Sequence, residues 1–265
     1  MNANTAAPPV PEQSFRVDSL QVQVYSTRTL MGRAAARDVA AKIRERIAER
    51  SELAMIFAAA PSQNELLAEL STLDGIPWQR ITAFHMDEYV GLASEHPQSF
   101  GSFLRERIFG RVPFGAVHYL NGAAPDLAAE CERYASLLRA TPPEIVCLGI
   151  GENGHIAFND PGVADFDDPF LVKLVDLDER SRVQQVHDGC FPTLDEVPKQ
   201  ALTLTIPALT MARWMFCVVP GPTKTAAIKA TLQGPITEQC PATVLRLHPG
   251  ATLYLDRAAV GQSIS

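Results

Sequence analysis

The sequence predicts a single α/β domain with a mostly parallel sheet and helices on both faces, and three observations lead to this prediction. The 265 residues are 46% hydrophobic and 20% charged, an ordinary globular composition on a chain long enough to bury a sizeable core. Short apolar runs alternate with helical patterns, which is typical of βαβ units. The run IVCLGI at 145–150 is continuously apolar, as expected of a central parallel strand covered on both faces.

The order of the elements follows from periodicity. Residues 1–14, rich in alanine and proline, are predicted to form a flexible N-terminal arm, and residues 15–265 the single domain. Strands are predicted at 20–24, 55–60, 81–86, 145–150, 171–177, 201–206, 214–219 and 251–256, and helices at 30–47, 64–73, 97–109, 126–139 and 222–232. Because such sheets bind ligands outside the carboxyl ends of their strands, we expect the chemistry at the strand-to-helix junctions.

Charge and cysteine content narrow the class of partner. The net charge of -7 argues against nucleic acid, because binding to a phosphate backbone needs a basic face. The five cysteines are scattered singly, so we expect no metal site and no disulfide framework, and a reducing cytoplasm as the location. No signal-peptide pattern and no apolar run of roughly 18 residues occurs, so no membrane partner is expected.

The first candidate junction follows the strand predicted at 55–60. Ser62 and Glu65 have the spacing of a capping box, in which each side chain satisfies a free backbone N–H. The start of a helix could instead offer those N–H groups to a phosphate. The residues by themselves favour the cap.

The second junction places two adjacent carboxylates, Asp87 and Glu88, after the strand at 81–86. One of them could point into the crevice as a general base whose pKa is raised by burial. Both could equally be ordinary acids in a solvated loop. The residues alone leave the two interpretations open.

The third junction is a glycine-bordered loop at 149–161 that presents Asn153, His155 and Asp160. It contains the spacing G-x-G-x-x-G, so a dinucleotide site has to be considered. That fingerprint should open a long helix, whereas Pro161-Gly162 would end one early. A histidine held beside an amide and an acid at a strand end is a candidate catalytic group.

The fourth junction, Gly221-Pro222-Thr223-Lys224, follows the strand at 214–219. Proline suits the first position of a helix, and glycine lets a ligand approach the backbone. A lysine in the first helical turn is unfavourable to the helix dipole. An anion bound at the start of the helix would explain the position of Lys224.

Together these junctions resemble the glucosamine-6-phosphate deaminase/isomerase family, whose superfamily includes the 6-phosphogluconolactonases. GHIAFN favours the deaminases, because the lactonases typically follow the glycine–histidine pair with a Thr-Ala-Ser-type sequence. The stretches that carry the resemblance are MDEYVGL at 86–92, HPQSF at 96–100, LNG at 120–122, GENGHIAFNDP at 151–161, VPK at 197–199, ALT at 201–203 and LHP at 247–249.

The resemblance implies a modified Rossmann-like fold, no metal or organic cofactor, and conversion of an amino-sugar phosphate to a ketose phosphate and ammonia. Asp87 falls on the family's enolisation base, His155 on the histidine that assists ring opening, and Lys224 on a lysine that binds phosphate. Asn153 and Asp160 are then expected to orient the His155 ring. The other predicted substrate-binding residues are Ser62, Gln63, Glu88 and Gly154.

Four positions depart from the family pattern. Asn153 stands where the family usually has aspartate, and Asp160 where it usually has glutamate. Residues 59–63 replace a Gly- and Thr-rich phosphate loop, and a phosphate-binding arginine aligns near His187. Because an aspartate at 153 would hydrogen-bond the His155 ring, we expect a slow deaminase that Asn153→Asp would accelerate.

The sequence therefore predicts a deaminase/isomerase acting on a small sugar phosphate, as a monomer or a homo-oligomer. One alternative is a sugar-phosphate lactonase in which His155 activates water. Another is a non-catalytic sugar-phosphate sensor, motivated by Asn153 and the altered phosphate loop. A nucleotide-dependent dehydrogenase is the last alternative.

Overall fold

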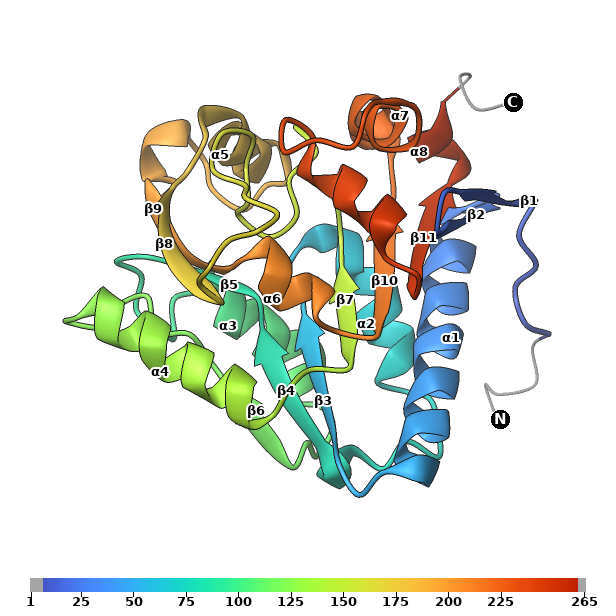
Figure 1. Ribbon diagram of the computed structural model, residues 1–265, viewed down its shortest axis with the longest axis horizontal. Helices are drawn as coiled ribbons and strands as arrows, with labels where there is room; N and C mark the ends of the chain where they lie inside the picture. Colours follow the sequence, from blue (N-terminus) through green and yellow to red (C-terminus); the bar gives the residue numbers. More distant parts are fainter. Residues whose placement is uncertain (1–6, 262–265) are drawn as a thin grey trace.

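The computed structural model describes residues 7–261 and contains a large sheet with helices on both faces, and a second, smaller sheet (Figure 1). The large sheet has eight strands in the order β1-β2-β11-β10-β7-β3-β4-β6. Its pairs are parallel except for β1 with β2. The strands are β1 (Gln13–Val17), β2 (Leu20–Tyr25), β3 (Leu53–Phe57), β4 (Ile81–His85), β6 (Ala116–His118), β7 (Ile145–Leu148), β10 (Trp214–Val219) and β11 (Ala251–Asp256). The predicted fold class is confirmed.

Helices cover both faces of this sheet (Figure 1). The helices are α1 (Arg28–Glu49), α2 (Asn64–Leu70), α3 (Phe100–Leu104), α4 (Leu127–Ala140), α5 (Glu179–His187), α6 (Ile206–Thr210), α7 (Thr225–Gln233) and α8 (Arg257–Val260), of which α5 lies near the smaller sheet (Figure 1). The short turns η2 (Pro61–Gln63) and η6 (Pro222–Lys224) precede α2 and α7. Within residues 7–261, no helix is both long and apolar enough to cross a membrane.

The alternation of side chains along β7 explains its continuous apolar sequence. Val146 and Leu148 face a core formed with α4, α6 and α7. Ile145 and Cys147 face the opposite core, formed with α1 and α2. All four side chains are fully buried. Because both faces of the strand are covered, every side chain along it is apolar.

The strands predicted at 171–177 and 201–206 do not join the parallel sheet. They form β8 (Val172–Asp176) and β9 (Gln200–Leu204) of a separate antiparallel sheet with β5 (Asp87–Tyr89), a strand that the sequence analysis did not predict. Met86 connects the two sheets, because its N–H donates to the Phe57 carbonyl and its carbonyl accepts from Leu204 N–H. Asp87 is therefore the first residue beyond the end of the main sheet.

The amino-terminal segment adds a strand beside β2. β1 includes Gln13 and Ser14, the last two residues of the range assigned to the arm, and residues 1–6 lie outside the described residues. The flexible arm and the division into one domain remain predictions.

Candidate active site

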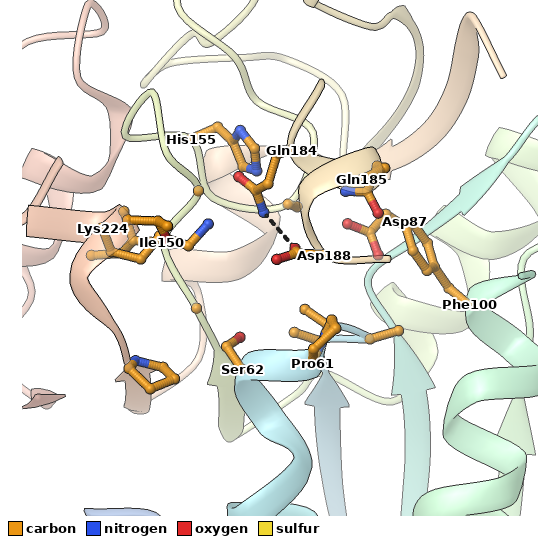
Figure 2. Close-up of a pocket in the computed structure, with 18 of the residues that line it drawn as sticks. Pro61, Ser62, Asp87, Phe100, Ile150, His155, Gln184, Gln185, Asp188 and Lys224 are labelled. Atoms are coloured by element: carbon orange, nitrogen blue, oxygen red, sulfur yellow. Dashed lines mark hydrogen bonds between the residues drawn. The ribbon is translucent and has the colours of Figure 1, made fainter. Parts of the chain in front are cut away.

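A small pocket lies where β3, β4, β7 and β10 end, and all four candidate junctions contribute to it (Figure 2). Its volume is about 180 Å³, below the usual range for drug-sized ligands, so it suits a small ligand better than a dinucleotide. Ser62, Asp87, His155 and Lys224 line it. Figure 2 shows Asp87 and Lys224 on opposite sides.

Asp87 faces the pocket from the seam between the two sheets. Its side chain is 7% exposed, and β5 pairs it with Thr203 of β9. Burial, and secondarily the charge of Glu88, raise the pKa of Asp87 well above its usual value. A carboxylate with a raised pKa is a stronger base once ionised, which suits proton abstraction.

His155 is held in the loop after β7 by a turn and by a buried carboxylate. Gly151 N–H donates to the His155 carbonyl at 2.9 Å, and the ring Nδ1 lies 2.9 Å from Asp160 Oδ1. Burial acts to raise the pKa of Asp160, but the hydrogen bond and charge of His155 and further donors outweigh it and lower the pKa to about 2. The histidine thus faces an ionised partner.

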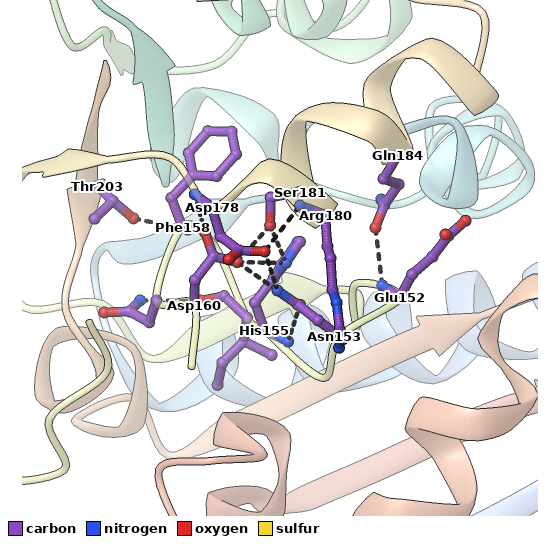
Figure 3. A network of polar contacts seen from close by, with 12 residues as sticks. Glu152, Asn153, His155, Phe158, Asp160, Asp178, Arg180, Ser181, Gln184 and Thr203 are labelled. Carbon is purple, nitrogen blue, oxygen red and sulfur yellow. Dashed lines mark hydrogen bonds and ion pairs between the residues drawn. The ribbon is translucent and has the colours of Figure 1, made fainter. Parts of the chain in front are cut away.

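Asn153 contacts this carboxylate and the backbone of His155, rather than the imidazole ring as the sequence predicted. Its amide Nδ2 donates to Asp160 Oδ1 at 3.0 Å, and its Oδ1 accepts from His155 N–H at 3.1 Å. Asp178 Oδ1 is a more distant acceptor, at 3.5 Å. Asn153 therefore supports Asp160, and only Asp160 of the predicted pair reaches the ring (Figure 3).

Lys224 supplies a buried positive charge. Its residue is 6% exposed, and its Nζ has no hydrogen-bond partner among residues 7–261. Its Nζ forms a long ion pair with Glu152 Oε1, at 3.9 Å. Burial lowers the pKa of Lys224, while the charges of Asp188 and Glu152 act to raise it. A buried ammonium without a hydrogen bond is costly, so an anionic ligand would satisfy it.

The segment after β3 differs from the predicted capping box. Neither η2 nor α2 has a side-chain cap, and Glu65 instead accepts from Arg28 Nε at 2.7 Å. Ser62 lines the pocket. Gln63 is buried beneath it, where Nε2 donates to the Leu148 carbonyl at 3.0 Å and so joins the carboxyl end of β7 to η2. The cap prediction is wrong, because Ser62 accepts from Gln63 of the same turn and Glu65 pairs with Arg28 of α1.

Glu88 and Gly154 lie next to the pocket residues without lining the pocket. Glu88 accepts from the N–H groups of Tyr89, Phe100 and Gly101, which anchors the start of α3. Gly154 has φ +88, and a Cβ there would approach Cys240 Sγ to 2.8 Å. The structure places both residues as supports of the site, whereas the sequence predicted ligand contacts.

Helix α5 forms a wall of the pocket that the sequence analysis missed. Gln184, Gln185 and Asp188 line the pocket, while His187, near which the family arginine was aligned, does not. The HPQSF resemblance also pointed near Phe100, which does line it. A strongly polar nine-residue helix between two strands gave no periodic signal, so only its place in the fold reveals its function.

The position of the His155 ring requires a residue without a side chain at Gly151. A Cβ at this position would lie 2.2 Å from His155 Nε2 and Cε1. We expect Gly151→Ala to displace the ring and to lower kcat by about 100-fold, as misplacement of a catalytic group by about 1 Å can do. Steady-state kinetics checks this. Gly91→Ala, where no atom lies within 4 Å of the added carbon but φ is +88, should cost stability and retain kcat; equal losses of kcat would contradict the steric explanation.

Among residues 7–261, no group of three His, Cys, Asp or Glu side chains is arranged to hold a metal ion. The pocket instead combines a buried base, a histidine paired with a carboxylate, and a buried ammonium. On a doubly wound sheet, this arrangement defines an α/β enzyme for a small anionic substrate.

The chain belongs to the family described as glucosamine-6-phosphate isomerases/6-phosphogluconolactonase, which matches residues 26–254. It is 41% identical to a glucosamine-6-phosphate deaminase of Bacillus cereus over 181 residues, 68% of this chain and 67% of the relative. It is 35% identical to a deaminase of the same name from an Exiguobacterium species over 227 residues, 83% and 84% of the two chains. The family resemblance is confirmed.

Solved structures agree with this assignment. A monomeric glucosamine-6-phosphate deaminase superposes with a TM-score of 0.82 at 32% identity, covering 90% of this chain and 98% of that one. A 6-phosphogluconolactonase from Thermotoga maritima gives 0.72 at 21% identity, covering 90% and 100%. The second likeness concerns the fold alone.

Proposed function

We propose that this protein converts glucosamine 6-phosphate, or a close amino-sugar phosphate, and water to a ketose phosphate and ammonia. The observation that carries the proposal is the opposition of a buried base, Asp87, and a buried ammonium, Lys224, across one small pocket. The deaminase relatives support the choice of substrate. A cytoplasmic location and the oligomeric state stay predictions from the sequence.

In the proposed reaction, His155 and Asp87 each carry out one proton transfer. His155 moves a proton between the anomeric hydroxyl and the ring oxygen, which opens the sugar ring. Asp87 takes the proton from C2 and returns it to C1, while one proton of the amine passes to the C1 oxygen, so that the amine-bearing C2 becomes an imine and C1 an alcohol. Addition of water at C2 then releases ammonia. The raised pKa of Asp87 makes its ionised form a stronger base, which suits this transfer.

Lys224 and Ser62 would hold the phosphate. Gln184 and Gln185 of α5 and Asp188, directly after it, add two amides and a carboxylate to the pocket lining. Arg28 also lines the pocket, but its Nε is paired with Glu65 at 2.7 Å. Lys224 is thus the group we expect to dominate phosphate affinity.

Purified protein incubated with glucosamine 6-phosphate should release ammonia and fructose 6-phosphate in equal amounts. Ammonia is measured with a glutamate dehydrogenase couple and the ketose phosphate with an isomerase couple. Equal release supports the proposal. No turnover of any hexosamine phosphate would refute it.

The same preparation separates the alternatives from the sequence. Hydrolysis of 6-phosphogluconolactone without ammonia release would identify a lactonase with His155 activating water. Binding of hexose phosphates by calorimetry without turnover would identify a sensor.

The contacts of Asn153 predict that Asn153→Asp lowers kcat, whereas the sequence analysis predicted that it would raise the rate. The amide donates to Asp160 with Asp178 nearby, so a carboxylate at 153 would face two others. Like charges at this distance raise carboxyl pKa values and displace the side chains. We expect kcat to fall about tenfold, equivalent to about 1.4 kcal/mol of barrier. Asn153→Ala removes the donor without adding charge and should be milder; a faster Asn153→Asp would show that the aspartate orients the ring.

A further inference from the structure

Ser181 is a buried hydroxyl between His155 and Asp160 that the sequence analysis did not identify. It lies in the first turn of α5 and is 1% exposed. Its Oγ is 2.8 Å from His155 Nδ1, and it donates a short hydrogen bond to Asp160 Oδ1. Figure 3 shows the three side chains converging from the loop after β7 and from α5.

The single proton of this hydroxyl decides the direction of both contacts. Asp160 is ionised near neutral pH, because its hydrogen bonds lower its pKa to about 2 although burial acts to raise it. An ionised carboxylate only accepts hydrogen bonds, so the Ser181 proton goes to Asp160. A lone pair of Ser181 Oγ then faces His155 Nδ1. Only an Nδ1 that carries a proton completes this contact.

Asp160 alone does not give Nδ1 an acceptor of its own. Its Oδ1 lies 2.9 Å from Nδ1, but the same oxygen already accepts from Asn153 Nδ2 at 3.0 Å and from Ser181. His155 Nδ1 therefore shares this oxygen with two other donors. The hydroxyl oxygen of Ser181 is therefore the acceptor that His155 Nδ1 has to itself, without a competing donor.

The other nitrogen of the His155 ring, Nε2, lies on the side of the ring that faces the pocket. A Cβ on Gly151 would come within 2.2 Å of Nε2, and both Gly151 and His155 line the pocket. With its proton on Nδ1, the neutral ring presents an Nε2 lone pair to whatever occupies the pocket.

We infer that Ser181 is a positioning residue that sets the tautomer of His155, so that Nε2 meets the ligand as a proton acceptor. The hydroxyl acts through the histidine and has no ligand contact of its own in this arrangement. The kinetic consequence rests on the proposed function, in which His155 opens the sugar ring. The tautomer itself is a property of the ligand-free protein and is measured without substrate.

The direct test is nitrogen NMR of protein labelled with ¹⁵N-histidine. The chain has six histidines, and the ring signals missing from the spectrum of His155→Gln are those of His155. In the wild type, we expect Nδ1 to have the shift of a protonated ring nitrogen and Nε2 that of an unprotonated one. In Ser181→Ala, the two shifts should move toward each other as the second tautomer is populated. Ser181→Thr keeps the hydroxyl and should keep the wild-type pattern.

Kinetics gives the second test. We expect Ser181→Ala to lower kcat by about 10- to 100-fold, while KM changes by less than about threefold, because the ligand contacts remain. Ser181→Thr should recover most of the lost kcat. Ser136→Ala is the matched control, because Ser136 is an exposed residue of α4 whose hydroxyl donates to Glu132. It should match the wild type in both experiments.

Unchanged nitrogen shifts in folded Ser181→Ala would overturn the inference, because Asp160 alone would then set the tautomer. A fall in kcat with an equal rise in KM would also contradict it, since a merely displaced α5 wall would produce both. If the wild type turns over no hexosamine phosphate, the proposed function fails, and the nitrogen shifts still decide the role of Ser181.

Discussion

Asp87→Asn is expected to lower kcat by about 10³-fold or more, in the upper range of what a general base contributes. The amide has the shape of the carboxylate but cannot accept the C2 proton. Binding of the product fructose 6-phosphate, measured by calorimetry, should be nearly unchanged, because Asp87 lies across the pocket from Lys224. A loss of activity below about tenfold would show that Asp87 is not the base.

The same variant should be more stable than the wild type at neutral pH. Burial and Glu88 raise the pKa of Asp87 in the folded protein. Its favourable contribution to stability is therefore complete below the unfolded pKa, about 3.9, and is lost as the pH rises through the folded pKa. Asparagine does not titrate. The unfolding temperature of Asp87→Asn should exceed that of the wild type at pH 8, and the difference should shrink toward pH 4.

Asp188→Asn provides the matched comparison, since it makes the same chemical change on another carboxylate of the pocket. It removes a negative charge near Lys224 and is expected to alter KM with little change in kcat. A large fall of kcat in both variants would indicate a general electrostatic effect in place of proton transfer at Asp87.

Lys224→Ala is expected to raise the Kd of hexosamine phosphates by about 10- to 100-fold. A hydrogen bond from a charged group is worth roughly 1.5–3 kcal/mol, and each 1.4 kcal/mol is about tenfold in affinity. The unphosphorylated amino sugar never makes this contact, so its weak binding should be unaffected. Calorimetry with both sugars measures the difference directly.

Lys224→Met serves as the control for shape, because it keeps an apolar stem of similar length. Burial disfavours the charged form of Lys224, whose Nζ has no hydrogen-bond partner in the described part of the chain. Without ligand, Lys224→Met should therefore unfold at the same or a higher temperature than the wild type. Equal losses for both sugars, or a marked loss of stability, would assign Lys224 a structural role.

The sequence by itself determined six of the eight strands of the main sheet, all but β1 and β6. β7, β3 and β10 are apolar runs because both of their faces are covered. Such burial can be recognised from the local sequence pattern alone. The junction residues Asp87, His155 and Lys224 were predictable for the same reason. Reactive side chains placed directly after such strands have to meet at one edge of the sheet.

Only the tertiary structure decided which groups these side chains touch. The amide of Asn153 turns to Asp160, Glu88 anchors α3, and Ser181 reaches His155 from 26 positions along the chain. Strand periodicity also could not assign β8 and β9 to a second sheet, because alternation encodes which face is buried and not which strand lies alongside. Contacts between segments that are distant in the sequence produce no local sequence pattern. The role of α5 and of the Ser181 hydroxyl could therefore be recognised only from their position against the pocket.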